Sequence, residues 1–162
     1  MNGNQILSFD EISIITTAVI MGTFGRVYLL KEDYRQYPSY PNGYLIHIII
    51  GFVASALGAV AIPALLSKNY TAVTFLTVAL QQFRDVRKME KESLNDLENT
   101  EYTYRGNAYI DGIAKTFESR NYIAFITSFI VSLSITIFPF YLWINIITGI
   151  VLGLAITQLS HL

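Results

Sequence analysis

The fold is decided by one charged stretch between apolar ones, residues 84–120: RDVRKMEKESLNDLENTEYTYRGNAYIDGIAKTFESR. This stretch holds most of the lysine and arginine residues of the chain, whereas long apolar segments lie on either side of it. Charged side chains are costly inside a bilayer, so such an insert between hydrophobic segments is typical of a polytopic membrane protein. We therefore expect a transmembrane helical bundle with one helical insert outside the membrane.

Composition supports the membrane class. The chain has 162 residues, of which 52% are hydrophobic and only 14% are charged, whereas a soluble domain has about 25% charged residues. Four or five helices of about 20 residues leave little chain for a separate soluble domain, so residues 1–162 are expected to form a single membrane domain. The net charge of −1 provides no basic field for nucleic acid. The absence of cysteine excludes disulfides and thiolate chemistry.

Five apolar segments frame the insert. Prolines and an Asn-Gly pair predict that the connector at residues 31–43 is a turn-rich loop rather than a helix. The third segment is shorter than the roughly 17 residues of a spanning helix, so it either spans or lies at the interface, and we favour spanning. We therefore expect an all-α bundle of four to five membrane helices. The segments are residues 12–30, 44–66, 70–83 (the short one), 122–138 and 140–159.

The insert itself is expected to be helical. Apolar residues recur at three- and four-residue steps from Phe83 to Leu97, which indicates that the third segment continues as a helix beyond the membrane. Residues 99–107 break this pattern, with Gly106 as the interruption. A second short helix over residues 109–119 is then expected to lead back to the membrane.

Lysine and arginine placement predicts the orientation. If all five segments span and the N-terminus lies outside, the inner side receives Lys31, Arg35 and the basic residues of the insert, and the outer side keeps Lys68. This distribution follows the positive-inside rule. We therefore expect a multi-pass cell-membrane protein with a cytoplasmic insert at residues 84–120. Residues 1–11 lack a basic region, so no cleavable signal peptide is expected.

Several long blocks between residues 26 and 122 point to a protein family. They include DYRQYPSYPNG (33–43), LGAVAIPAL (57–65), FLTVALQQFRDVRKME (75–90), YIDGIA (109–114) and FESRNY (117–122). Together these blocks resemble the YIEGIA family of membrane proteins from endospore-forming Gram-positive bacteria. The resemblance implies a bacterial membrane location and a link to sporulation, and it implies no particular reaction.

The namesake motif of that family differs from this chain at one position. The family motif has glutamate where this chain has Asp111, which keeps the charge but shortens the reach of the side chain. Members of the family also extend well beyond 162 residues. The resemblance therefore implies a short form or a piece of a longer protein.

Two polar residues lie within the predicted spans near the inner face. Arg26 is either a functional group, because an arginine in a membrane span is costly, or a side chain that snorkels to the headgroups. His47 is either a functional group, as a proton-handling side chain or the partner of a carboxylate, or an interfacial histidine bonded to backbone or water. The two lie at the same predicted depth, and Asp33 or Asp111 would complete a polar cluster with them.

The insert carries a second candidate set, Asp111, Lys115 and Glu118, which are spaced four and three residues apart. On a helix they share one face, where they either form an ion-pair ladder or provide two carboxylates for acid–base chemistry. Gly112 costs about 1 kcal/mol relative to alanine within a helix. Close backbone contact with another element would explain that glycine.

Small residues suggest close helix packing. Ser55 lies about 12 Å along the helix axis from His47 at 1.5 Å per residue, which is too far for a direct serine–histidine pair. We therefore interpret Ser55 as part of a packing face, since small residues let helix backbones approach in membranes. The small residues are Gly51, Ser55 and Gly58 in the second segment, and Gly149 and Gly153 in the fifth.

Functions from different classes remain open. The favoured function is that of a non-enzymatic membrane protein whose insert, residues 84–120, is a docking or regulatory surface for a cytoplasmic or membrane protein partner. A homo-oligomer of the chain is one of the assemblies that this function allows. The alternative is a membrane-embedded, protease-like hydrolase. A transport function needs polar residues near the midplane of the membrane, and no charged residue is expected there. No cofactor is expected, and two histidines argue against a metal site. The candidate catalytic residues are Arg26, His47, Asp111 and Glu118.

Overall fold

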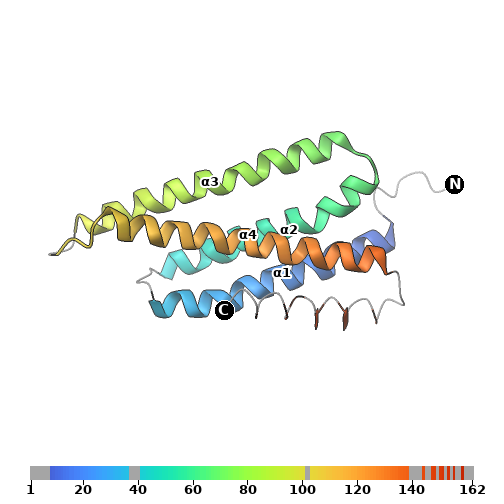
Figure 1. Cartoon of the computed structure of the whole chain (residues 1–162), viewed down its shortest axis with the longest axis horizontal. Coiled ribbons are helices and arrows are strands. Elements are labelled where there is room, and N and C mark those ends of the chain that lie inside the picture. The colour runs from blue at the N-terminus through green and yellow to red at the C-terminus, as the bar shows by residue number, and fades with distance from the viewer. Residues whose placement is uncertain are drawn as a thin grey trace.

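The computed structural model is an elongated bundle of long helices (Figure 1). It describes residues 8–36, 41–100 and 103–138, and then residues 144, 147, 148, 150, 151, 153, 155 and 158. The predicted all-α class is confirmed within these ranges. The helices are α1 (Phe9–Gln36), α2 (Pro41–Leu66), α3 (Tyr70–Glu98) and α4 (Asn107–Ile137).

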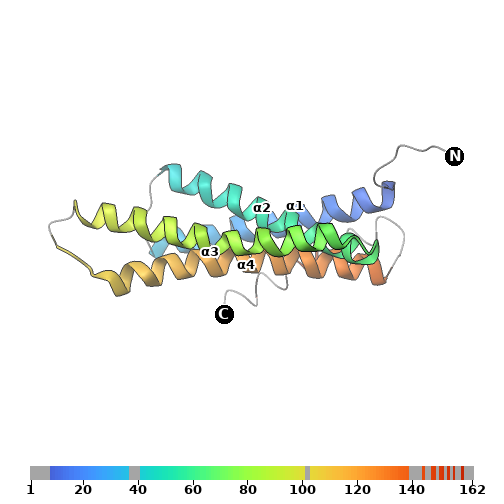
Figure 2. The same cartoon turned by 90° about the horizontal axis from the view of Figure 1, so that it is seen from above.

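Contacts between the helices define their directions. His47 of α2 stacks on Phe117 of α4, and Ser132 of α4 donates a hydrogen bond to the carbonyl of Ala59 in α2. Residue numbers therefore rise together, and α2 and α4 are parallel. Helix α3 lies antiparallel to both, so it runs back along the length of the bundle (Figure 1). The ends of α3 and α4 that meet near residues 99–106 extend beyond α1 and α2, as Figure 2 shows; we call them the projecting hairpin.

The first connector differs from its prediction. Helix α1 continues to Gln36 and α2 begins at Pro41. The prediction of a loop over residues 31–43 is therefore wrong for the residues of this range that the structure describes. The extra turns of α1 place Asp33 two turns after Arg26, where the two side chains bond. Proline is tolerated in the first turn of α2, because the N–H it lacks has no partner there.

The insert is built from two long helices. Helix α3 is continuous, as predicted, and the predicted break is confirmed at the described residues between Glu98 and Asn107, with Gly106 at a φ of 93° that favours glycine. The separate short helix expected over residues 109–119 is wrong, because α4 continues without interruption to Ile137. No glycine or proline follows Gly112 within α4 to end it earlier.

Three of the described helical stretches are long and apolar enough to cross a membrane. They are Phe9–Lys31, Gly43–Leu66 and Asn107–Ile137, and they indicate membrane association by length and composition. Helix α3 is not among them, because its second half is rich in charged residues. The expected fifth segment, residues 140–159 with Gly149, lies mostly outside the described residues.

Small residues let α2 approach its neighbours. A Cβ at Gly58 would overlap the carbonyl oxygen of Phe125 in α4. Ser55 is fully buried and donates a 2.8 Å hydrogen bond to the carbonyl of Gly51, one turn earlier. These contacts confirm the predicted packing face of α2. The packing prediction for Gly153 is also confirmed, because a Cβ there would lie 2.6 Å from a side chain of α1.

Gly58→Val is expected to lower the melting temperature of the detergent-solubilised protein markedly, because the branched side chain meets a backbone carbonyl that cannot rotate away. Circular dichroism during heating measures this change. Gly112→Ala is the control: a Cβ there meets nothing within 4 Å, so the close contact expected at Gly112 is wrong. Alanine should stabilise that site by up to about 1 kcal/mol. An unchanged melting temperature for Gly58→Val would show that α2 and α4 are not tightly packed.

Candidate functional site

Charged side chains are buried where the second half of α1 and the start of α2 pack against α3 and α4. Three of them are almost fully buried, with exposed fractions of 1% for Arg26, 1% for Asp33 and 3% for His47. Charged residues are rarely buried to this extent without partners. Their polar contacts link α1 to α4, through Asp33 and Arg120, and α2 to α3, through His47 and Glu90. The buried charge cluster consists of Arg26 and Asp33 (α1), His47 (α2), Glu90 (α3) and Arg120 (α4).

Asp33 binds two arginines at once. The Nη1 of Arg26 donates to its Oδ2 over 3.2 Å, and the Nε of Arg120 donates to its Oδ1 over 3.1 Å. The carboxylate therefore ties α1 to α4. The Nε and Nη2 atoms of Arg26 are buried and have no partner among the described protein groups, a situation that ordered water commonly relieves. Gly51 makes room for this arginine, because a Cβ there would overlap the Arg26 side chain.

His47 joins α2 to α3. Its Nε2 lies 3.1 Å from Oε1 of Glu90. Its ring stacks on Phe117, with the ring centroids 4.0 Å apart and the planes 17° from parallel. The cluster contains two guanidinium groups and two carboxylates, so these four groups are balanced in charge when the imidazole is neutral. A balanced, hydrogen-bonded set is the form in which buried charges are tolerated.

A second set of ion pairs connects α3 to α4 in the region of the insert. Arg87 bonds to Asp111 over 3.2 Å and to Glu118 over 3.1 Å, and Lys91 bonds to Asp111 over 3.2 Å. The expected ladder within one helix is therefore wrong, because both carboxylates bind α3 while Lys115 is exposed. These side chains are partly open to solvent, so their pairs contribute modest stability and mainly specify how the two helices align.

The structure divides the four candidate catalytic residues between these two sets. Arg26 and His47 enter the buried charge cluster, whereas Asp111 and Glu118 bind basic side chains of α3. Asp33, rather than Asp111, is the carboxylate that meets Arg26. Snorkelling of Arg26 is wrong, because its side chain is buried. For His47 the alternative of a carboxylate partner is confirmed, because Glu90 binds it, and the expectation of a histidine bonded to backbone or water is wrong.

Two residues of the buried charge cluster were not singled out from the sequence. Glu90 lies in α3 between Phe83 and Leu94, at a position where the helical spacing of apolar residues would place another apolar side chain. Arg120 follows Phe117 by one turn on the packed side of α4. A charged residue at an otherwise apolar step is the signal that identifies such positions. The signal was present in both helices, but it does not say which partner the charge meets.

The described residues do not form a serine–histidine pair. A serine nucleophile needs a base within hydrogen-bond reach, and Ser55 donates instead to a backbone carbonyl. The described contacts of His47 are Glu90 and Phe117. Within the described part of the chain, no three histidine or carboxylate side chains gather in a way that would hold a metal ion.

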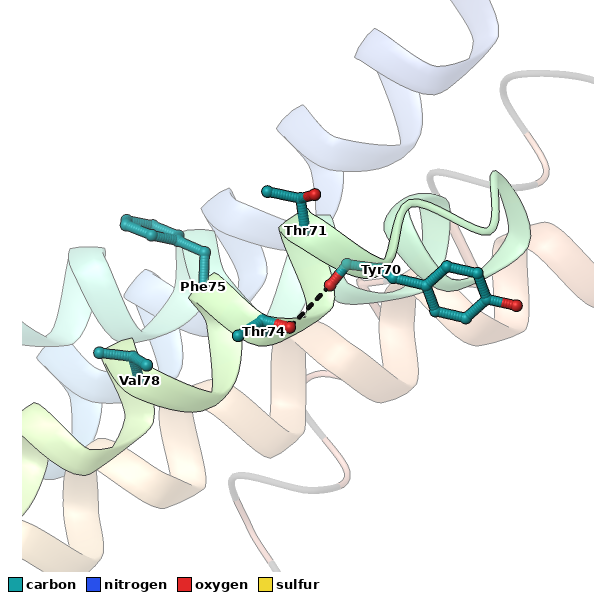
Figure 3. Close-up of a pocket in the computed structure, with 5 residues that line it drawn as sticks. All are labelled: Tyr70, Thr71, Thr74, Phe75 and Val78. Atoms are coloured by element: carbon teal, nitrogen blue, oxygen red, sulfur yellow. Dashed lines mark hydrogen bonds between the residues drawn. The ribbon is translucent and has the colours of Figure 1, made fainter.

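A shallow depression of about 550 Å³ lies on α3, at the end away from the projecting hairpin (Figure 3). Its walls contain no histidine, carboxylate or lysine, and the hydroxyl of Thr74 donates to the carbonyl of Tyr70. It is lined by Tyr70, Thr71, Thr74, Phe75 and Val78.

Asp33→Asn is expected to destabilise the bundle by about 3–5 kcal/mol, the usual cost of removing one partner of a buried ion pair. Denaturant unfolding in detergent measures the change. The control is Lys88→Gln, which removes an exposed pair with Glu92 at 4.0 Å and should change stability little. The double variant Arg26→Met with Asp33→Leu should recover part of the loss, since the fully buried guanidinium is removed with the carboxylate, and Arg120, which also loses Asp33, is 20% exposed and can be hydrated. A double variant as unstable as Asp33→Asn would argue against this coupling.

Comparisons with known proteins identify the family. The family model described as YIEGIA protein matches residues 14–162. The chain is 46% identical over 142 residues to "Uncharacterized protein YphB" of Bacillus subtilis (strain 168), an alignment that covers 88% of this chain and 47% of YphB. It thus spans about half the length of that relative, and no solved structure matches it. The chain belongs to the YIEGIA family of endospore-forming bacteria, as the blocks around YIDGIA predicted.

Proposed function

We propose that this chain is an integral membrane protein whose insert, residues 84–120, is a docking or regulatory surface for a cytoplasmic or membrane protein. The observation that carries the proposal is the contrast between buried and exposed charge. The buried charges bind one another across the bundle, which is a structural use. The insert instead presents side chains of both signs to solvent, such as Lys88, Glu92 and Lys115.

The helix directions support a spanning α3. Helices α2 and α4 are parallel neighbours, and both contain a stretch long and apolar enough to cross a membrane. Two parallel spans can follow one another in a chain only if the segment between them crosses back. Helix α3 therefore crosses the membrane although only its first half, from Tyr70 to Phe83, is mainly apolar. Four spans follow for α1 to α4, with the N-terminus outside and the projecting hairpin in the cytoplasm by the positive-inside rule.

The hydrolase alternative has weaker support. It requires a base that is available to a substrate, but His47 is 3% exposed and engaged with Glu90. It also requires a nucleophile beside that base, and Ser55 is used in helix packing. A docking role needs neither feature. The occurrence of the family in endospore-forming bacteria favours a sporulation-associated partner.

Membrane topology tests the first part of the proposal. The chain has no cysteine, so Lys68→Cys and Thr100→Cys each provide one thiol, at the turn between α2 and α3 and at the tip of the projecting hairpin. In intact protoplasts, a membrane-impermeant maleimide should label the first variant, and it should label the second after lysis. Labelling of both thiols from the same side would refute a spanning α3.

Site-specific photo-crosslinking tests the docking surface. A photoreactive amino acid at Lys115 or Tyr104, both exposed in the insert, should yield one discrete adduct with another protein in sporulating cells. The same probe at Leu65, exposed near the other end of α2, is the control and should not yield that adduct. Mass spectrometry of the adduct identifies the partner. Absence of an adduct at both insert positions, in growing and sporulating cells, would remove the docking proposal.

A further inference from the structure

Contacts between α2 and α3 fix which of their residues lie at the same height along the bundle. The two helices run in opposite directions (Figure 1). Phe83 of α3 packs in one cluster with Ala54 of α2, and Glu90 of α3 lies 3.1 Å from His47 of α2. These two contacts are equally far apart on both helices, so one residue forward on α2 corresponds to one residue back on α3.

At equal heights the two helices expose opposite chemistry. Ile49 of α2 is 52% exposed, whereas the side chain of Lys88, at the same height on α3, is 78% exposed. One turn closer to the projecting hairpin, Leu45 of α2 and Glu92 of α3 form a second pair of exposed residues at one height. The exposed apolar side chains of α2 extend over about 12 Å at 1.5 Å per residue. We call them the apolar strip of α2; they are Leu45, Ile46, Ile49, Phe52 and Val53.

Helix α1 continues the apolar strip and shows where it ends. Arg26 occupies the space beside Gly51, and α1 runs opposite to α2, so the exposed Tyr28 lies at the height of the strip. Lys31 is exposed near the end of the strip, within one turn of the height of the exposed Tyr44. Lysine and tyrosine side chains are typical of the level of the lipid headgroups. This pattern favours lipid, rather than another protein, as the cover of the strip.

Helix α4 shares the polar side of the bundle with α3. Lys115 and Ser119, which lie on either side of the ring that stacks on His47, are exposed. The buried charge cluster shows the same division, because its members on α1 and α2 are almost fully buried. The side chains of Glu90 on α3 and Arg120 on α4 are partly exposed. Water therefore suits the side of α3 and α4 at the height where lipid suits α1 and α2.

A bilayer of uniform thickness does not fit both sides. The apolar run of α2 from Tyr44 to Leu66 is about 33 Å long, whereas that of α3 from Tyr70 to Phe83 is about 20 Å long, at 1.5 Å per residue. The hydrocarbon core of a bilayer is about 30 Å thick. The outer ends of both runs meet at the short turn of residues 67–69, so the whole difference falls at the other end, beside the charged half of α3.

We propose that lipid chains cover the apolar strip of α2 while water covers α3 and α4 at the same height. The cytoplasmic leaflet is then thinner beside α3 than beside α2 by about 13 Å, and we call the region without lipid chains the hydrated notch. Local thinning and water entry are known responses of a bilayer to charge at membrane depth. This inference rests on the proposed topology, in which α3 crosses the membrane. It extends that topology, because the notch lets a cytoplasmic partner reach the insert through water from Arg84 onward.

Spin labels at matched heights test the hydrated notch. The chain has no cysteine, so Ile49→Cys and Lys88→Cys each carry one nitroxide label, on α2 and α3 respectively. The full chain is reconstituted in vesicles of phosphatidylcholine and phosphatidylglycerol. Electron paramagnetic resonance then measures collisions of the label with oxygen, which concentrates in lipid, and with a polar nickel chelate, which stays in water. The ratio of oxygen to nickel collisions should be roughly tenfold higher for Ile49→Cys, because hydrocarbon excludes the polar chelate.

A second pair and a control on α3 support the measurement. Leu45→Cys and Glu92→Cys are matched in height in the same way and should differ in the same direction. Val78→Cys is the control, because Val78 is exposed on the apolar half of α3 and its label should resemble the label at Ile49. All five positions are exposed, so the labels leave helix packing unchanged, which circular dichroism during heating verifies.

Equal collision ratios within the matched pairs would overturn the hydrated notch. Two lipid-like labels place lipid over the charges of α3, and two water-like labels place the apolar strip in water. A label that is shielded from both reagents lies against protein, which overturns lipid or water as the cover of that face. Labelling of Lys68→Cys and Thr100→Cys from the same side refutes the proposed function itself, whereas correct topology with equal ratios refutes this inference alone.

Discussion

The bundle depends on the carboxylate of Asp33, which is buried and accepts hydrogen bonds from arginines of two helices. A buried carboxylate is costly alone, and a buried guanidinium is equally so. Each charge is therefore acceptable only while the other helix supplies its partner. This mutual dependence ties the last turns of α1 to the middle of α4, and the neighbouring pair of His47 with Glu90 places a similar constraint on α2 and α3.

Small residues make this arrangement sterically feasible. Gly51 leaves the space that the stem of Arg26 occupies, and Gly58 lets α2 touch the backbone of α4. Buried ion pairs in a protein this apolar add specificity of alignment rather than bulk stability, because well-packed apolar groups of similar size are often as stable. The charges select one register of the helices, and the glycines permit the close approach that this register needs.

Much of the architecture could be predicted from local pattern. The continuous α3 followed from its three- and four-residue steps, and the break before α4 followed from Gly106. The packing face around Ser55 followed from the spacing of small residues. The connector after Lys31 was mispredicted, because proline and glycine signals describe local preference while the pairing of Asp33 with Arg26 is a tertiary contact. Partners so far apart in sequence, such as Arg120 with Asp33, leave no periodic trace.

The sequence by itself determined the helical class and the family and indicated membrane association, because hydropathy, period and motif are properties of neighbouring residues. Only the tertiary structure decided which charges meet. It separated Asp111 from Arg26 and His47, assigned Glu90 to the histidine, and set α2 parallel to α4. It also left one polar face of α3 turned away from the bundle. The physical reason is that burial and pairing depend on the positions of all helices together, and no single segment carries that information.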